Sequence, residues 1–159
     1  LGIVSGALFL SWGAAWSFAA DVPEKPVWKV GVAAVDVTPT ESLWMAGYAS
    51  RSKPSEGVTN PLYAKALSFE DERGTKFVMV TLDLIGMPRT MRDAIVQRVE
   101  EKHQLPSSSV MFNASHTHSG PVVRSGGSVL YDLTPEQAQK VDAYNSGLKD
   151  KLVDLIGAA

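Results

Sequence analysis

The sequence contains no cysteine, and this absence excludes disulfide bonds and thiolate metal sites. Any zinc site must therefore use histidine, aspartate, glutamate, tyrosine or water as ligands. Basic charge is not in excess either. The net charge of −2 gives no reason to expect nucleic acid or an anionic membrane as a partner. Apolar residues form 45% of the chain and charged residues 20%, which is ordinary for one modest globular domain of 159 residues.

Charge is also absent from the first twenty residues. Their apolar stretch has the length of the hydrophobic region of a signal peptide, and Ser17-Phe18-Ala19 resembles the small-x-small cleavage pattern. The stretch is short for a membrane span and lacks cationic flanks. We therefore expect residues 1–20 to be a secretory signal peptide and the protein to be secreted or periplasmic. A buried helix or a retained membrane anchor is the alternative.

Four segments of the remaining chain are strand-like. Residues 28–37 are rich in valine, and a change of parity halfway along suggests a bulge or a strand buried on both faces. Residues 62–70 and 76–85, joined by a turn that contains glycine, predict a β-hairpin. The apolar run 110–114 predicts a short buried strand. Residues 44–57, with two glycines and a proline, predict a loop.

Two segments have helical spacing. Residues 89–104 carry apolar side chains at helical intervals, and Thr90 with Asp93 could form a capping arrangement. A strong helix start follows at Thr134, with proline next and glutamine three residues on. One face of this last helix would carry Val141, Tyr144, Leu148, Leu152 and Leu155. The order strand, hairpin, helix, strand, helix predicts a mixed α/β fold: a β-sheet core with a hairpin and covering helices.

The stretch His-Thr-His-Ser-Gly-Pro at residues 116–121 contains two of the three histidines. It follows the predicted strand 110–114, and the loop after such a strand is where α/β folds usually place their chemistry. In an extended segment His116 and His118 point to the same side. Both could then bind a metal, or one could bind it while the other stabilises a developing oxyanion. Two ligands do not complete a catalytic zinc site, so further ligands must come from elsewhere. Two backbone-bonded histidines in a tight turn are the structural alternative.

Other polar residues have weaker claims. Asp83 interrupts an apolar strand, and it could orient a metal-bound imidazole or accept backbone N–H groups at the strand end. We expect Asp36 to be a turn acceptor and His103 to be a solvated residue at an exposed helix end. Ser115 and Ser119 flank the histidines, but adjacent residues seldom reach the geometry of a nucleophile and its base, and the Gly-x-Ser-x-Gly pattern is absent.

Several segments, in this order, make the chain resemble the neutral/alkaline non-lysosomal ceramidases at the start of their catalytic domain. They are Gly-Val-Ala-Ala-Val-Asp-Val-Thr-Pro (31–39), Met-Ala-Gly-Tyr-Ala (45–49), Pro-Leu-Tyr-Ala-Lys-Ala-Leu (61–67), Val-Thr-Leu-Asp-Leu-Ile-Gly (80–86) and His-Thr-His-Ser-Gly-Pro (116–121). Single pieces are weak signals, whereas the ordered set is fairly specific. Family members are several times longer, so we expect residues 21–159 to be the N-terminal portion of a truncated catalytic domain.

This resemblance implies a zinc-dependent hydrolase of an N-acyl amide bond, which converts ceramide to sphingosine and a fatty acid. It implies that His116 is a zinc ligand and that His118 is the catalytic residue that stabilises the tetrahedral intermediate. The remaining ligands (a second His, a Glu and a Tyr) and an Arg that assists the oxyanion would follow residue 159. We therefore expect residues 21–159 alone to be inactive. The implied partner is a lipid-like amide substrate, ceramide or a relative, with peripheral contact to a membrane.

Two alternatives stay open. Residues 122–125 lack the glycine-rich continuation associated with this family, which leaves another amide or ester as the substrate of a secreted metal-dependent hydrolase. The spacing does not continue as in metallo-β-lactamase-like proteins, and the strand–helix repeats of a TIM-barrel amidohydrolase do not follow. The other alternative is a non-catalytic secreted domain that keeps the fold without the metal.

Overall fold

The computed structural model describes residues 28–123 and 131–159. The expected signal peptide, and Arg124 and Ser125 of the segment that departs from the family pattern, lie outside these residues. The described part has a mixed α/β fold, as predicted, and none of its helices is long and apolar enough to cross a membrane. Its elements are β1 (Trp28–Asp36), β2 (Tyr63–Asp71), β3 (Lys76–Leu82), α1 (Arg89–His103), the short 3-10 helix η1 (Ser107–Ser109), β4 (Val110–Ala114) and α2 (Pro135–Ala158).

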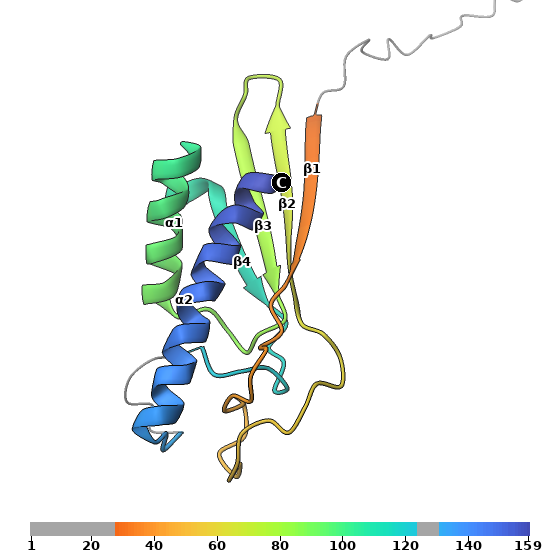
Figure 1. The fold of residues 1–159 in the computed structure, drawn as a ribbon. Helices are drawn as coiled ribbons and strands as arrows, with labels where there is room; N and C mark the ends of the chain where they lie inside the picture. The colour runs from red at the N-terminus through yellow and green to blue at the C-terminus, as the bar shows by residue number, and fades with distance from the viewer. Residues whose placement is uncertain (1–27, 124–130) are drawn as a thin grey trace, which may run out of the picture.

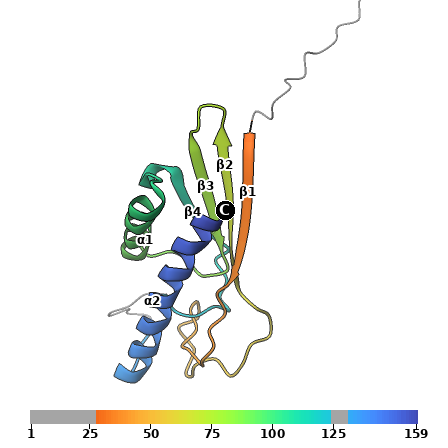
Figure 2. The same cartoon turned by 45° about the horizontal axis from the view of Figure 1, so that its top comes forward.

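The four strands form one sheet in the order β1-β2-β3-β4 (Figure 1). β2 and β3 are the predicted hairpin, and β1 pairs with β2 in the same antiparallel manner. β4 instead runs parallel to β3, and α1 makes the crossover between them. As a result, β1, β3 and β4 all end at the same edge of the sheet. The loops that follow them gather there, at the bottom of Figures 1 and 2.

β1 differs from the prediction. Its pairing with β2 runs without a break from Trp28, opposite Asp71, to Asp36, opposite Tyr63, so there is no bulge. It is an edge strand and is not buried on both faces: one row of its side chains is half-buried and the other is exposed. The parity change reflects the two faces of the strand: Val30 and Val32 lie on the exposed row, whereas Val35 lies on the half-buried row that faces the core.

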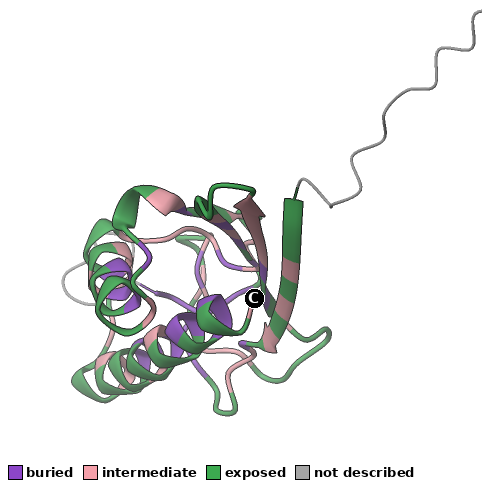
Figure 3. Cartoon of the chain, turned by 90° about the horizontal axis from the view of Figure 1, so that it is seen from above, coloured by how far each residue is buried: buried purple, intermediate pink, exposed green. Residues whose placement is uncertain are grey.

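Both helices cover the same face of the sheet (Figures 1 and 2). Figure 3 shows their buried faces turned inward and exposed residues along the outer face of α2. The apolar spacing of α2 is confirmed, since its predicted face is buried or half-buried. The core between helices and sheet is formed by Ala64, Ala66, Val78, Val80, Leu82, Leu84, Ile95, Val99, Leu148, Leu152 and other apolar side chains.

The other face of the sheet is apolar as well, but no helix of the described residues lies on it. Trp28, Val30 and Val32 of β1 are 55%, 58% and 75% exposed, and across the sheet Met111 of β4 is 43% exposed. Val30 is paired with Phe69, so the apolar row continues onto β2. The expected burial of β4 is therefore only half right, because its alternate side chains lie on this uncovered face.

The N-termini of the two helices are capped differently. Thr134 caps α2 as predicted: its side chain accepts from the N–H of Gln137, and the Gln137 side chain accepts from the Thr134 N–H. The expected capping by Thr90 and Asp93 is wrong. Pro88 is the N-cap residue of α1, without a side-chain cap bond, and Asp93 instead bonds its neighbour Arg92.

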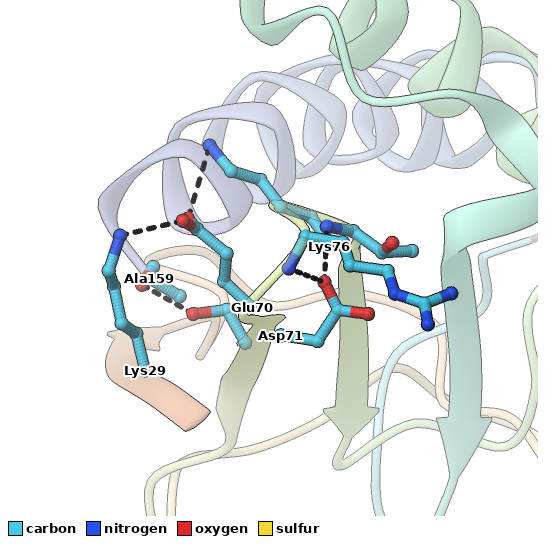
Figure 4. A network of polar contacts seen from close by, with 8 residues as sticks. Lys29, Glu70, Asp71, Lys76 and Ala159 are labelled. Carbon is cyan, nitrogen blue, oxygen red and sulfur yellow. Dashed lines mark hydrogen bonds and ion pairs between the residues drawn. The ribbon is translucent and has the colours of Figure 1, made fainter. Parts of the chain in front are cut away.

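At the end of the sheet away from the loop cluster, polar contacts hold the hairpin and its neighbours (Figure 4). The Glu70 carboxylate lies 2.7 Å from Lys29 Nζ and 3.7 Å from Lys76 Nζ, which links three strands. The Asp71 carboxylate accepts from two backbone N–H groups of the hairpin turn. Ser68 Oγ lies 2.6 Å from the carbonyl oxygen of Ala159, so the end of α2 is fastened to β2.

His103 does not lie in solvent as expected. It is half-buried where α1 meets α2, and its Nε2 is buried with no hydrogen-bond partner among the described residues. A Cβ added at Gly157 would overlap with its ring, so the glycine permits this close approach of the helices. The neighbouring ion pairs, Lys102 with Asp154 at 2.7 Å and Arg98 with Asp150 at 2.8 Å, lie on the exposed side of the same contact.

Candidate active site

The segment that carries the histidine pair follows β4 directly, and Figures 1 and 2 show that the loops after β1, β3 and β4 lie together. The motif leaves β4 at Ala114 beside the end of β3, where Ser115 N donates to the Leu82 carbonyl over 2.9 Å. It then pairs with the loop that follows β1, through an isolated bridge between Met45 and Pro121. Two segments that resemble one family and lie some 70 residues apart in the sequence are thus brought together at one edge of the sheet.

His116 is oriented by a backbone group. Its Nδ1 lies 2.7 Å from the carbonyl oxygen of Ile85, in the loop after β3. A carbonyl oxygen only accepts, so Nδ1 carries a proton and donates; in the neutral ring Nε2 then has the lone pair. The residue is exposed and has φ +59°, in the left-handed region that non-glycine residues seldom adopt. An imidazole fixed in this way has the tautomer that a metal ligand needs.

His118 is held against a different part of the molecule, the loop after β1. Its ring meets Tyr48 edge-on, with 4.8 Å between ring centroids, and it also lies over the backbone at Gly47. A Cβ added at Gly47 would lie 2.6 Å from His118 Cβ and overlap the ring. Gly47 itself has φ +106°, and its N–H donates to Tyr131 Oη over 2.8 Å. This position therefore requires glycine for two independent reasons.

The two imidazoles lie close together as predicted, although the segment is not extended, because His116 has a left-handed φ. Their ring centroids are 5.2 Å apart and their planes are inclined by 65°. Thr117 and Ser119, the alternate residues of the motif, point elsewhere. They line a cavity of about 970 Å³ that the loop after β1 encloses with residues 55–60. The imidazoles are not among its lining residues, so this cavity belongs to the other side of the motif.

The aspartates serve the loop structure. The Asp83 carboxylate accepts from the N–H of Tyr63 over 3.0 Å, and this confirms the structural alternative of the two weighed for it. Asp36 accepts from the N–H of Thr38 over 2.7 Å, as predicted. The Thr38 side chain and then its backbone N–H hold the pKa of the Asp36 carboxyl below its ordinary value. The acceptor that orients His116 is thus the Ile85 carbonyl and not the nearby carboxylate.

The flanking serines take no part in a nucleophile pair. No hydrogen bond joins the hydroxyl of Ser115 or Ser119 to an imidazole in the described part of the chain, and Ser119 N donates to Thr117 Oγ1 over 3.1 Å. Sequence reasoning did not find Ile85 or Gly47 as positioning groups. Every residue has a carbonyl group, so nothing in the sequence distinguishes Ile85. Gly47 could have been found, because a glycine in a segment that resembles the family can indicate a close approach of the backbone.

The metal-binding capacity of this region is incomplete by itself. No group of three or more histidine, aspartate or glutamate side chains converges within residues 28–123 and 131–159. His116 Nε2 fits a zinc ion as a donor, because its opposite nitrogen is already committed to Ile85. A zinc site at this place would need at least two more protein ligands from outside the described residues.

Comparisons with known proteins agree with one another. The family model described as "Neutral/alkaline non-lysosomal ceramidase, N-terminal" matches residues 28–150. Proteins named neutral ceramidase from Drosophila pseudoobscura pseudoobscura and Drosophila melanogaster are 27% identical over 113 residues, which cover 67% of this chain and 16% of each relative. The chain thus spans about a sixth of the length of these curated relatives.

Two solved structures have the same fold. The neutral ceramidase from Pseudomonas aeruginosa superposes with a TM-score of 0.72 over 86% of this chain and 22% of its own, at 24% sequence identity. A structure titled "Ceramidase complexed with C2" gives a TM-score of 0.68 over 83% of this chain and 21% of that one, again at 24% identity. At this level of identity the two structures bear on the fold alone.

Proposed function

Because this chain belongs to the family of neutral/alkaline non-lysosomal ceramidases, we propose that it forms part of a zinc-dependent ceramidase. The reaction would be hydrolysis of the N-acyl amide bond of ceramide. The bond between the acyl carbon and nitrogen breaks, water supplies the hydroxyl of the fatty acid, and the sphingosine amine takes up a proton. The names of the curated relatives, neutral ceramidase, support this substrate class.

The observation that carries the proposal is the hydrogen bond between His116 Nδ1 and the Ile85 carbonyl. It fixes the tautomer of the neutral ring and leaves Nε2 as the donor to zinc. A zinc ion bound there would supply a hydroxide at neutral pH, because it would lower the pKa of its water to about 7. The remaining ligands would come from polypeptide outside residues 28–159.

His118 would act on the substrate. Its ring centroid lies 5.2 Å from that of His116, so both imidazoles serve one reaction centre. A hydrogen bond donated by His118 to the amide oxygen would stabilise the negative charge that develops there as the carbonyl is attacked. The contact with Tyr48 keeps the ring from turning away, which conserves this geometry between turnovers.

Substitution of His116 tests the metal role. In the full-length protein, His116→Ala should lose bound zinc and ceramide cleavage together, measured by metal analysis and by release of sphingosine. His103→Gln is the control, because His103 lies at the helix contact away from the loop cluster. Zinc loss with undiminished cleavage would contradict the proposed mechanism. Retention of zinc by His116→Ala would contradict the assignment of the ligand.

Substitution of His118 tests the second role. We expect His118→Gln to retain zinc and to lower kcat by about 10²–10³-fold, the usual effect of removing one oxyanion donor. Full activity of this variant would remove His118 from the mechanism. Absence of zinc and of amide hydrolysis from the unaltered full-length protein would instead favour the non-catalytic alternative.

We propose in addition that the protein is exported. The support is the uncharged stretch of residues 1–20, with the small residues before Asp21. N-terminal sequencing of the mature protein from the producing cell should begin near residue 20. A mature chain that retains this stretch would contradict cleavage.

A further inference from the structure

Arg51 joins the loop after β1 to the histidine motif. Its Nη2 donates to the carbonyl oxygen of His118 over 2.6 Å. Its other terminal nitrogen, Nη1, lies 3.8 Å from Met45 Sδ, and its Cζ lies 5.2 Å from the centroid of the Tyr48 ring. One guanidinium therefore touches the backbone of His118 and, at the same time, the aromatic ring against which the His118 side chain packs.

The surrounding backbone bonds fix the register of this contact. Ala46 N donates to the Gly120 carbonyl, and Val122 N donates to the Trp44 carbonyl, each over 2.9 Å. These bonds align the two loops, but they begin two residues beyond His118 and do not reach it. The carbonyl of His118 is bonded instead by the half-buried Arg51 side chain. A charged donor makes a stronger hydrogen bond than a neutral one. Because the guanidinium is planar and also contacts Tyr48, a movement away from the His118 carbonyl would break both contacts.

We infer that Arg51 is a positioning residue for His118. It holds the carbonyl of His118 while Tyr48, held in turn beneath the guanidinium, limits the rotation of the imidazole. His116 does not share this support, because its ring is fixed from the other side by Ile85. The inference rests on the proposed role of His118 and deepens it: ligand binding at His116 and the placement of His118 are controlled by different residues.

The kinetic test uses the full-length protein with Arg51→Gln, which removes the charge and the planar fork. We expect kcat for ceramide to fall by about tenfold to a hundredfold, since a displacement of about 1 Å costs that order of rate. KM and the zinc content should stay within about twofold. Arg51→Lys keeps the charge and one donor and should recover part of kcat. Arg73→Gln, in the exposed turn between β2 and β3, is the matched control and should leave kcat unchanged.

A spectroscopic test follows the ring itself. In protein labelled with ¹³C at the histidine ring, the His118 signal is assigned by its disappearance in His118→Gln. The edge-on Tyr48 ring shifts this signal, so Arg51→Gln and Tyr48→Leu should both move it, while the His116 signal stays in place.

The outcomes separate the two proposals. An unchanged kcat in Arg51→Gln, a fall in kcat with an unmoved His118 signal, or loss of zinc along with activity would each overturn the positioning role. Absence of ceramide cleavage by the unaltered protein would contradict the proposed function, whereas the histidine signals report on the placement of the ring without any substrate.

Discussion

Two regions of the molecule, the body formed by the sheet and its helices and the cluster of loops after β1, β3 and β4, are stabilised by different contacts. In the body, the helices meet the sheet through fully buried aliphatic side chains such as Leu82, Ile95 and Leu152. The loop cluster has a smaller apolar group that includes Trp44 and Val122. Its loops are also joined by single polar groups: Thr38 bonds Leu62 N, Asp83 bonds Tyr63 N, and Arg51 bonds the His118 carbonyl. The first kind of contact is summed over many atoms, and the second is made or lost by one side chain.

This difference separates stability from placement. Loss of one buried side chain weakens the whole fold, because the cavity it leaves is only partly filled. Loss of one loop contact costs the fold less but changes where a functional ring lies. Tyr144 connects the two regions, since it lies on α2 and its hydroxyl donates to the Val37 carbonyl over 2.7 Å. Burial raises the pKa of Tyr144, so it remains a donor at neutral pH.

The largest expected effect on stability is in the body. Leu152→Ala, at a fully buried position of α2, should lower the free energy of unfolding by about 2–5 kcal/mol in urea denaturation. Ser146→Ala, on the exposed side of the same helix, is the control and should change it by less than about 0.5 kcal/mol. Equal effects of the two substitutions would show that α2 does not form the core contact described.

A single methyl group in the loop cluster should separate the two properties. Gly47→Ala forces a strained φ and a clash with His118, and strain of this kind costs about 1–3 kcal/mol. We expect this modest loss of stability together with a large loss of ceramide cleavage. Gly57→Ala is the matched control, because an added Cβ there meets no atom within 4 Å. Wild-type cleavage by Gly47→Ala would mean that the His118 ring is not needed where it lies.

Helix capping offers a smaller test, confined to the body. Thr134→Ala removes the capping box of α2 and should cost about 1 kcal/mol in the free energy of unfolding, measured by thermal or urea denaturation. Thr90→Ala is the control, because Pro88 and not Thr90 occupies the N-cap position of α1. A loss at Thr90 as large as that at Thr134 would restore the capping arrangement first expected for α1.

The smallest expected effect is the response of the loop cluster to acid. The pKa of Asp36 is lower in the folded state than in the unfolded state. Its ionised carboxylate therefore stabilises the fold at pH values above the unfolded-state pKa. That contribution is lost as the pH falls through the folded pKa. Asp36→Asn should therefore lose less stability than the unaltered protein between pH 7 and pH 3, measured by urea denaturation. The control is Asp142→Asn, an exposed carboxylate of α2. An identical acid response with and without Asp36 would contradict the assignment.

The body could be predicted from the sequence because its signals are local. The hairpin, the apolar face of α2 and the Thr134 cap each depend on residues a few positions apart, and all three are confirmed. The errors arise where burial depends on distant partners. The valine pattern of residues 28–37 predicted a bulge or a strand buried on both faces, but β1 is an unbroken strand at the edge of the described sheet, and its row with Val30 and Val32 is exposed. His103 read as surface, and the glycine that buries it lies 54 residues later in the sequence.

The loop cluster was predictable in its residue types and not in its contacts. The prediction that the His116 and His118 rings lie close together is confirmed, but the extended backbone from which it was argued is not formed at His116. Nothing local in the sequence pairs His116 with the Ile85 carbonyl or Arg51 with the His118 carbonyl, because each bond joins segments that meet only after the sheet has formed. Asp83 was one candidate partner of an imidazole, but its carboxylate accepts a hydrogen bond from Tyr63 N at the start of β2.

The uncovered apolar face of the sheet equips the molecule with an optical reporter. Trp28 lies on that face, 55% exposed and edge-on to Phe69 with 6.5 Å between ring centroids, whereas Trp44 is buried among the loops. Indole fluorescence moves to shorter wavelength when water is displaced from the ring. A polypeptide or lipid bound to the uncovered face of the sheet would therefore shift the fluorescence emission of Trp28 to shorter wavelength and leave the emission of Trp44 unchanged.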